Sequence, residues 1–113
     1  MAYVEELGRG YLYEINGGLI RPMYGGSYYQ VRGDMVESVG WGYAYQIEGD
    51  SIRRFGGSTL LTVSGGFIRT AFRGPVAEIY GNRIRTLDSS RQFVIEGAIS
   101  HNELMALIAV IFG

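Results

Sequence analysis

Four arginines recur at one place in an internal period of the chain and could bind anions. They are Arg21, Arg53, Arg69 and Arg85. The planar guanidinium group binds phosphate and carboxylate in a bidentate manner, so four in a row would form a candidate anion ladder. Because Glu14 and Glu78 are expected beside two of them, and Glu37 interrupts the row, an exposed face of paired charges is the simpler interpretation.

Six aromatic residues lie close together in the first half of the chain. They are Tyr24, Tyr28, Tyr29, Trp41, Tyr43 and Tyr45. Trp and Tyr rings stack on sugars and on peptide side chains, and the tyrosine hydroxyls add hydrogen bonds. This group is the preferred candidate for a binding surface. Cross-strand packing of aromatic rings would produce the same distribution without any ligand.

Residues for metal binding or nucleophilic catalysis are scarce. The chain has no cysteine, and His101 is its single histidine, so a zinc site or a Ser–His–Asp triad lacks its usual components. Asp34, Asp50 and Asn82 each follow a glycine, which is typical of tight turns. Convergence of these turns on a cation is the alternative. We expect a structural or exposed His101, no metal, no cofactor and no enzymatic activity.

A 16-residue repeat determines where these residues lie. Six glycines share this spacing, and each follows an Ile or Val two places earlier: Gly17, Gly33, Gly49, Gly65, Gly81 and Gly97. We number the repeat so that Tyr13 is position 1, which makes the branched residue position 3 and the glycine position 5. Position 8 is again Ile or Val in the first five repeats. A fixed period of this kind indicates a repeat architecture.

Each repeat is predicted to be a β-hairpin. Apolar residues at positions 1, 3 and 8, with a glycine between them, are typical of two short strands around a two-residue turn. Glycine first in the turn favours type II′, and this register places position 3 opposite position 8 and position 2 opposite position 9. Position 11 is also apolar, which requires either two partly covered faces or a bulge near positions 9 and 10.

The period stops after Gly97, where a helix is predicted. Ser100 and Glu103 form a capping-box pattern, and the apolar residues that follow leave almost no polar side on a helix over residues 100–112, so it must be buried. The sequence therefore predicts a single all-β domain over residues 1–113. About six hairpins over residues 3–99 form an up-and-down meander of about twelve strands, closed into a ring or an open barrel around the C-terminal helix.

The repeats resemble a known family. The segments YEINGGLIR, YQIEGDSIRR and AEIYGNRIR, followed by IEGAISHNELMALIAVIF, are similar to the short hairpin repeats of bacterial beta-flower type domains. The similarity covers roughly residues 13 to 112 of the chain. The resemblance implies a β scaffold without assigned catalytic residues.

Composition narrows the function without defining it. The net charge is −1, and 19% of residues are charged, so we expect neither nucleic-acid binding nor disorder. No signal peptide or membrane-spanning stretch is visible, which favours the cytoplasm and no membrane partner. The leading hypothesis is a non-enzymatic scaffold or protein-interaction domain, with a homo-oligomer as one form. The alternative is a small-ligand-binding domain with an aromatic pocket near Trp41.

Overall fold

The computed structural model describes residues 1–88 and 90–113, which form twelve β-strands and one C-terminal helix, α1 (His101–Phe112). The strands are four to seven residues long. In chain order they are β1 (Ala2–Glu6), β2 (Gly10–Asn16), β3 (Leu19–Pro22), β4 (Tyr29–Arg32), β5 (Met35–Ser38), β6 (Gly42–Glu48), β7 (Ser51–Arg54), β8 (Thr59–Ser64), β9 (Phe67–Thr70), β10 (Gly74–Tyr80), β11 (Arg83–Thr86) and β12 (Gln92–Glu96).

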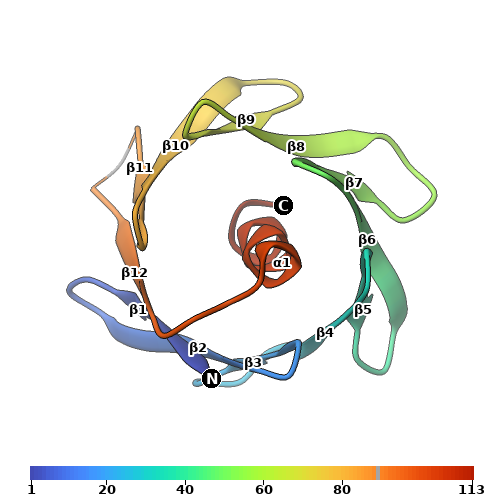
Figure 1. The fold of residues 1–113 in the computed structure, drawn as a ribbon, viewed down its shortest axis with the longest axis horizontal. Helices are drawn as coiled ribbons and strands as arrows, with labels where there is room; N and C mark the ends of the chain where they lie inside the picture. The colour runs from blue at the N-terminus through green and yellow to red at the C-terminus, as the bar shows by residue number, and fades with distance from the viewer. Residues whose placement is uncertain (89) are drawn as a thin grey trace.

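The strands form a closed antiparallel barrel, with α1 in its middle (Figure 1). Each strand pairs with its neighbours in the chain, and β1 also pairs with β12. The predicted all-β meander with a C-terminal helix is therefore confirmed, and the ring is closed rather than open. Within the described residues, no helix has the length and apolar character needed to cross a membrane.

The predicted register is confirmed in all five complete hairpins, where position 3 lies opposite position 8 and position 2 opposite position 9. Gly33, Gly49 and Gly81 have φ of 62°, 63° and 61° and are followed by residues without positive φ, as in type II′ turns. The other two turns are Gly-Gly pairs with positive φ at both residues, which is the type I′ pattern. The type II′ prediction is wrong there, because a second glycine removes the steric cost of positive φ.

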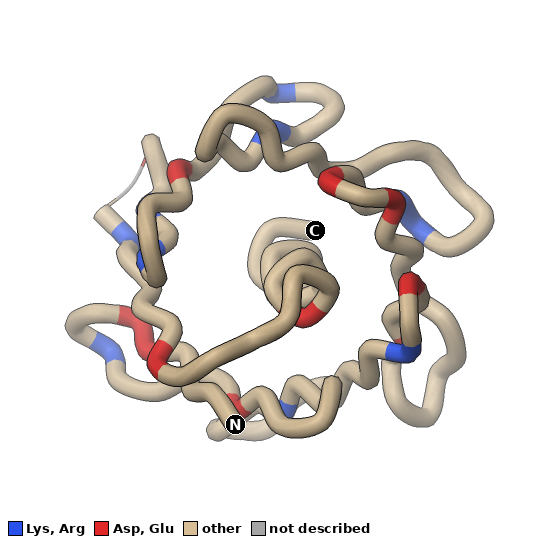
Figure 2. Tube along the Cα trace, viewed as in Figure 1, with Lys and Arg blue, Asp and Glu red and all other residues tan. Residues whose placement is uncertain are grey.

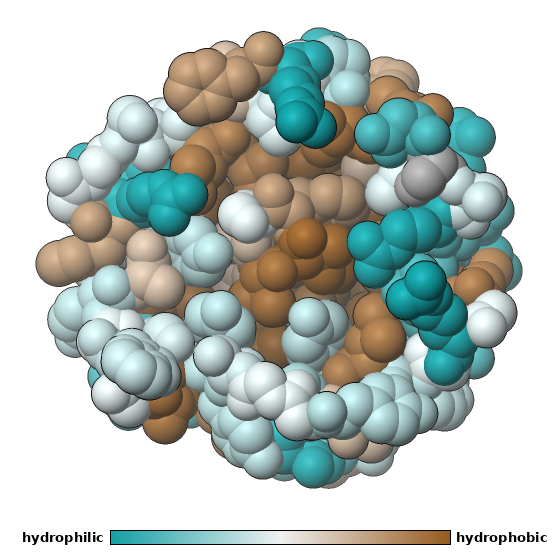
Figure 3. Space-filling view, turned by 180° about the vertical axis from the view of Figure 1, so that it is seen from behind, coloured by the Kyte–Doolittle hydropathy of each residue, from teal (hydrophilic) through white to brown (hydrophobic). Residues whose placement is uncertain are grey.

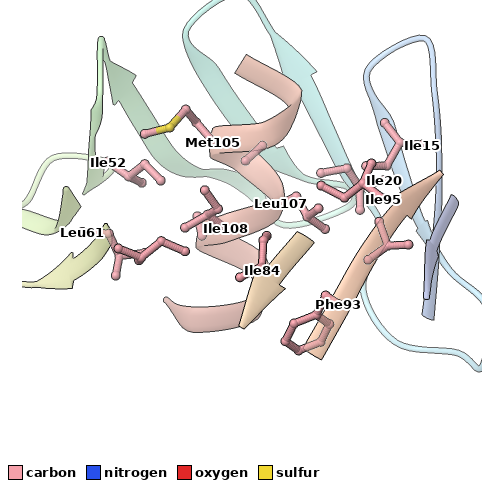
Figure 4. Close-up of a cluster of buried hydrophobic side chains, with 14 of the residues drawn as sticks. Ile15, Ile20, Ile52, Leu61, Ile84, Phe93, Ile95, Met105, Leu107 and Ile108 are labelled. Carbon is pink, nitrogen blue, oxygen red and sulfur yellow. The ribbon is translucent and has the colours of Figure 1, made fainter. Parts of the chain in front are cut away.

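Position 8 forms the middle layer of the core. Its six residues have no exposed surface: Val4, Ile20, Val36, Ile52, Ile68 and Ile84. Met105, Leu107 and Ile108 of α1 pack inside this layer (Figure 4). Each such side chain contributes about 1.5–3 kcal/mol when fully buried. The predicted burial of the helix is confirmed.

Position 11 lies outside the core. Four strands contain a bulge in which one residue has no partner on the neighbouring strand: Leu12, Ala44, Leu60 and Val76. The backbone carbonyl of each bulged residue accepts a hydrogen bond from the backbone N–H of a position 11 residue. The side chains at position 11 follow the ends of the strands and are partly exposed. Each of these bulges thus lies on the strand that pairs with positions 8 and 9. The side chain at position 11 faces outward.

The barrel closes through a hairpin whose two strands come from opposite ends of the chain. Val4 lies opposite Ile95, which is the same pairing of position 8 with position 3 that the complete hairpins show. Gly97 lies beside Met1 at the place where the other hairpins have their turn, since a Cβ on Gly97 would collide with the Met1 carbonyl oxygen. We call this β1–β12 junction the seam.

α1 is attached to three successive hairpin turns by its first residues. The predicted capping box between Ser100 and Glu103 is present. Glu103 Oε2 accepts a hydrogen bond from the Gly18 N–H (3.0 Å), Asn102 Nδ2 donates to the Gly33 carbonyl (2.8 Å), and His101 Nε2 lies 3.0 Å from the Gly49 carbonyl oxygen. These three contacts attach the beginning of the helix to the turns of the first three repeats.

Candidate functional site

The barrel has two different ends. The turn end carries the two-residue hairpin turns and the beginning of α1. The loop end carries the loops that link successive hairpins and the last turn of α1; these linking loops comprise residues 7–9, 23–28, 39–41, 55–58, 71–73 and the described residues of 87–91. The linking loops spread outward from the ring in Figure 1.

The six candidate aromatic residues do not form one continuous surface. Tyr24 and Trp41 lie on linking loops and are 79% and 86% exposed. Tyr28 is also partly exposed and lies just before β4. Tyr43 stacks against Phe55 of the next linking loop, with ring centroids 5.3 Å apart. These four residues lie in or beside two successive linking loops, between β3 and β4 and between β5 and β6.

The remaining two candidates face the lumen. Tyr29 and Tyr45 have ring centroids 6.5 Å apart and pack against the core, as does Tyr13. Burial, and the nearby Tyr29 phenol, raise the pKa of both Tyr13 and Tyr45. All three occupy position 1 of their repeats. At neutral pH the Tyr13 and Tyr45 hydroxyls are therefore protonated and able to donate hydrogen bonds.

The four arginines of the candidate anion ladder lie apart on the outer wall. They are on β3, β7, β9 and β11, so another strand always separates them, and Figure 2 shows basic positions around most of the ring. Arg21 and Arg85 each lie 2.9 Å from a glutamate oxygen of the paired strand. Arg53 pairs with Glu48 at 2.7 Å, and Arg69 lies over the Phe67 ring. Anion binding by these four residues stays a prediction.

A cavity of about 400 Å³ opens at the loop end, beside the last turn of α1. Its lining residues are Thr70, Phe72, Arg73, Val76, Thr86, Asp88, Arg91, Ile111 and Phe112. Figure 3 views the barrel from behind: hydrophobic surface gathers in a central hollow, with hydrophilic side chains around much of its rim. The sequence did not single out these residues. An alignment of the linking loops would have found Phe72, which is 94% exposed and occupies the same repeat position as Tyr24.

An ion pair between a buried carboxylate and a half-exposed arginine lies next to this cavity. Glu6 is 3% exposed, and both of its carboxylate oxygens accept hydrogen bonds from Arg91, from Nε at 2.9 Å and from Nη2 at 3.1 Å. Arg91 also lies over the Phe93 ring, 4.9 Å from its centroid. Since Glu6 is on β1 and Arg91 directly precedes β12, the pair joins the two sides of the seam and holds the Arg91 guanidinium in place.

Groups that could hold a metal ion do not come together. Within the described residues, no cluster contains three or more His, Asp or Glu side chains. Asp34, Asp50 and Asn82 occupy three separate turns, as expected from ordinary turn chemistry. His101 is exposed and lies 3.4 Å from an oxygen of Asp50.

Comparison with family models, curated proteins and solved structures gives no match to this chain.

Proposed function

We propose that this protein is a non-enzymatic interaction domain that binds a second copy of itself through the loop end. The observation that carries this proposal is the exposure of Tyr24, Trp41 and Phe72, three aromatic residues on three different linking loops. Aromatic side chains are enriched at protein interfaces. Exposed aromatic side chains on three loops at one end of a barrel favour that end as a surface for a partner.

Further apolar side chains extend this surface around the whole ring. Five of the six linking loops begin with a large apolar residue at position 11 that is partly exposed: Leu7, Met23, Val39, Phe55 and Leu87. The repeat places these residues at equal intervals around the barrel. The apolar character of the loop end therefore follows from the repeat itself.

The loop end has the size that a stable dimer needs. The two longer dimensions of the molecule are 32 and 30 Å, and an ellipse of that size covers about 750 Å². A standard interface buries roughly 800 Å² on each partner. One end of the barrel is therefore large enough to form the interface on its own.

Contact between two loop ends is favoured over contact between a loop end and a turn end. The turn end offers glycines and acidic residues such as Asp34, Asp50 and Glu96, which would attract the arginines of a loop end. Exposed ion pairs contribute only about 0–1 kcal/mol each, whereas burial of one large apolar side chain contributes about 1.5–3 kcal/mol. Two loop ends bury apolar side chains from both partners and form a closed dimer.

Sedimentation velocity over a wide range of protein concentration tests the proposal. The wild type should pass from monomer to dimer and no further, and high salt should not weaken the dimer. The triple variant Tyr24→Ser, Trp41→Ser and Phe72→Ser should stay monomeric with an unchanged melting temperature. The variant Tyr80→Ser, which removes an exposed ring beside a two-residue hairpin turn, should dimerise normally.

A wild type that is monomeric at every concentration would refute the proposal, as would a triple variant that still dimerises. Stacks that grow beyond the dimer and dissolve in salt would show instead that a loop end binds a turn end.

A second candidate function is the binding of a small ligand. It is favoured by the cavity beside α1, which borders Phe72 and not Trp41. We also infer kinship with the beta-flower type domains, on the strength of the Tyr-x-Ile-x-Gly hairpins alone.

A further inference from the structure

The geometry points to the cavity at the loop end as a binding site for a small organic carboxylate with an apolar body. This inference goes beyond self-association, because it needs only one copy of the chain. It rests on where the cavity lies, on what forms its apolar wall and on which charged groups reach it.

The cavity lies beside a place where the repeat has a small, buried side chain. Position 1 is tyrosine in the first three repeats but alanine in the fifth, at Ala77. Thr86 lies directly opposite Ala77 in the β10–β11 pair, and Val76 precedes it; both line the cavity. At about 400 Å³ the cavity falls within the range of roughly 300–1,000 Å³ that holds small-molecule ligands.

Apolar side chains from two elements would hold the body of the ligand. Ile111 and Phe112 belong to the last turn of α1, and Val76 belongs to β10. The Phe112 ring packs edge-on against Phe93, with centroids 6.3 Å apart. Because α1 is attached to the opposite half of the barrel through Gly18, Gly33 and Gly49, this wall is preformed.

Two guanidinium groups reach the cavity, and they differ in how they are held. Arg91 uses Nε and Nη2 for Glu6, so within the described residues Nη1 is the nitrogen left for a ligand. Arg73 makes no ion pair with any residue that the structure describes. Its backbone N–H donates to Thr70 Oγ1 at 2.9 Å, which leaves the Thr70 hydroxyl proton for a ligand. These groups are donors, as a carboxylate requires.

One lining residue opposes an anion. Asp88 carries a negative charge at the rim of the cavity, and Glu6 offsets the charge of Arg91 from behind. Arg73 and the Arg91 Nη1 donor are thus the groups that decide the sign of the ligand. Asp88→Asn should tighten the binding of an anion and weaken the binding of a cation.

Titration of ¹⁵N-labelled protein with 4-phenylbutyrate tests the site, with 4-phenylbutyramide as the uncharged match. The acid should shift the backbone amide signals of Thr70, Val76 and Thr86, and the amide should bind more weakly by about tenfold, the value expected for the loss of a charged hydrogen bond. Arg73→Gln should weaken the binding of the acid by a similar factor. Arg54→Gln, which changes a loop-end arginine outside the cavity, should not.

Filling the cavity gives an independent test. Ala77→Leu restores bulk at position 1 and should abolish the shifts. If this variant does not fold, Thr70→Leu fills the cavity from its partly exposed wall and should have the same effect. Four outcomes would overturn the inference. The first two are absence of binding by the acid and equal binding of the acid and the amide. The other two are tighter binding of the amide after Asp88→Asn and unchanged binding in the filled variants.

The two proposals fail separately. None of the cavity variants removes Trp41 or Tyr24, so sedimentation of the same samples reports on self-association alone. Loss of phenylbutyrate binding with an intact dimer would contradict the carboxylate site only.

Discussion

At the scale of single residues, Glu6 is the one charged side chain that is buried in the described part of the chain. Its hydrogen bond from Arg91 is the main reason that the pKa of Glu6 is lowered from its ordinary value of 4.5, and burial opposes this shift. The same bond raises the pKa of Arg91. The Glu6 carboxylate therefore stays charged inside the barrel wall because Arg91 is there.

Glu6→Gln should lower the free energy of unfolding by about 1–2 kcal/mol at neutral pH, a modest loss because Arg91 is partly exposed to screening solvent. A lowered pKa in the folded state means that the stabilisation is complete above the unfolded-state pKa and is lost as the pH falls through the folded-state pKa. Urea denaturation at a series of pH values should therefore show wild type and variant converging in acid. Glu5→Gln, which changes the neighbouring residue on the outer face, should not show this pH dependence. A difference in unfolding free energy between wild type and Glu6→Gln that stays the same at every pH would contradict the prediction.

At the scale of elements, α1 depends on one carboxylate that serves two purposes. Glu103 Oε1 accepts a hydrogen bond from the Ser100 N–H at 2.9 Å, and Oε2 accepts one from the Gly18 N–H at 3.0 Å. The first bond caps the helix, and the second attaches it to the first hairpin.

Glu103→Gln should therefore keep one of these bonds and lose the other, since an amide has a single acceptor oxygen. We expect a loss of about 1 kcal/mol for Glu103→Gln and about 2 kcal/mol for Glu103→Ala, measured by thermal and urea unfolding. Ser100→Ala removes only the cap and serves as the matched control. Equal losses for the Gln and Ala variants would contradict this prediction, because the bond that Gln keeps would then contribute nothing.

The hairpins could be predicted from the sequence because their rules are local. Gly49, for example, identifies a turn, and the turn fixes the pairing of Ile47 with Ile52. Other features depend on residues far apart in the chain, as Glu6 and Arg91 do. The six aromatic residues appeared to be one group because the sequence does not show which side of the sheet each side chain faces. A bulge between Tyr43 and Tyr45 separates these two, and it forms only when β5 and β6 pair. The cavity could not be predicted because its lining residues come from β9, β10, β11 and the last turn of α1, which only the closed barrel brings together.

At the scale of the whole molecule, the seam is the one hairpin without a covalent turn. A disulfide formed by Glu5→Cys and Val94→Cys, which lie opposite each other in β1 and β12, would close a loop of about 90 residues. The equivalent bond from Thr62→Cys and Arg69→Cys closes about eight residues within one hairpin. Loop-closure entropy predicts that the seam disulfide stabilises the protein by about 2 kcal/mol more than the hairpin disulfide.

Melting temperatures of the oxidised and reduced forms of both variants measure this difference. A seam disulfide that raises the melting temperature no more than the hairpin disulfide would mean that β1 and β12 stay together in the unfolded ensemble.

The pairing of β1 with β12 also determines when the protein can finish folding during synthesis. β1 can pair with β2 as soon as both have left the ribosome, but its other edge has no partner until β12, about 90 residues later, has emerged. The residues of α1 that fill the lumen come later still. Until then the nascent chain is a curved sheet with two unpaired edges and an uncovered apolar concave face. In this form its edges are prone to pair with those of other nascent chains made from the same mRNA.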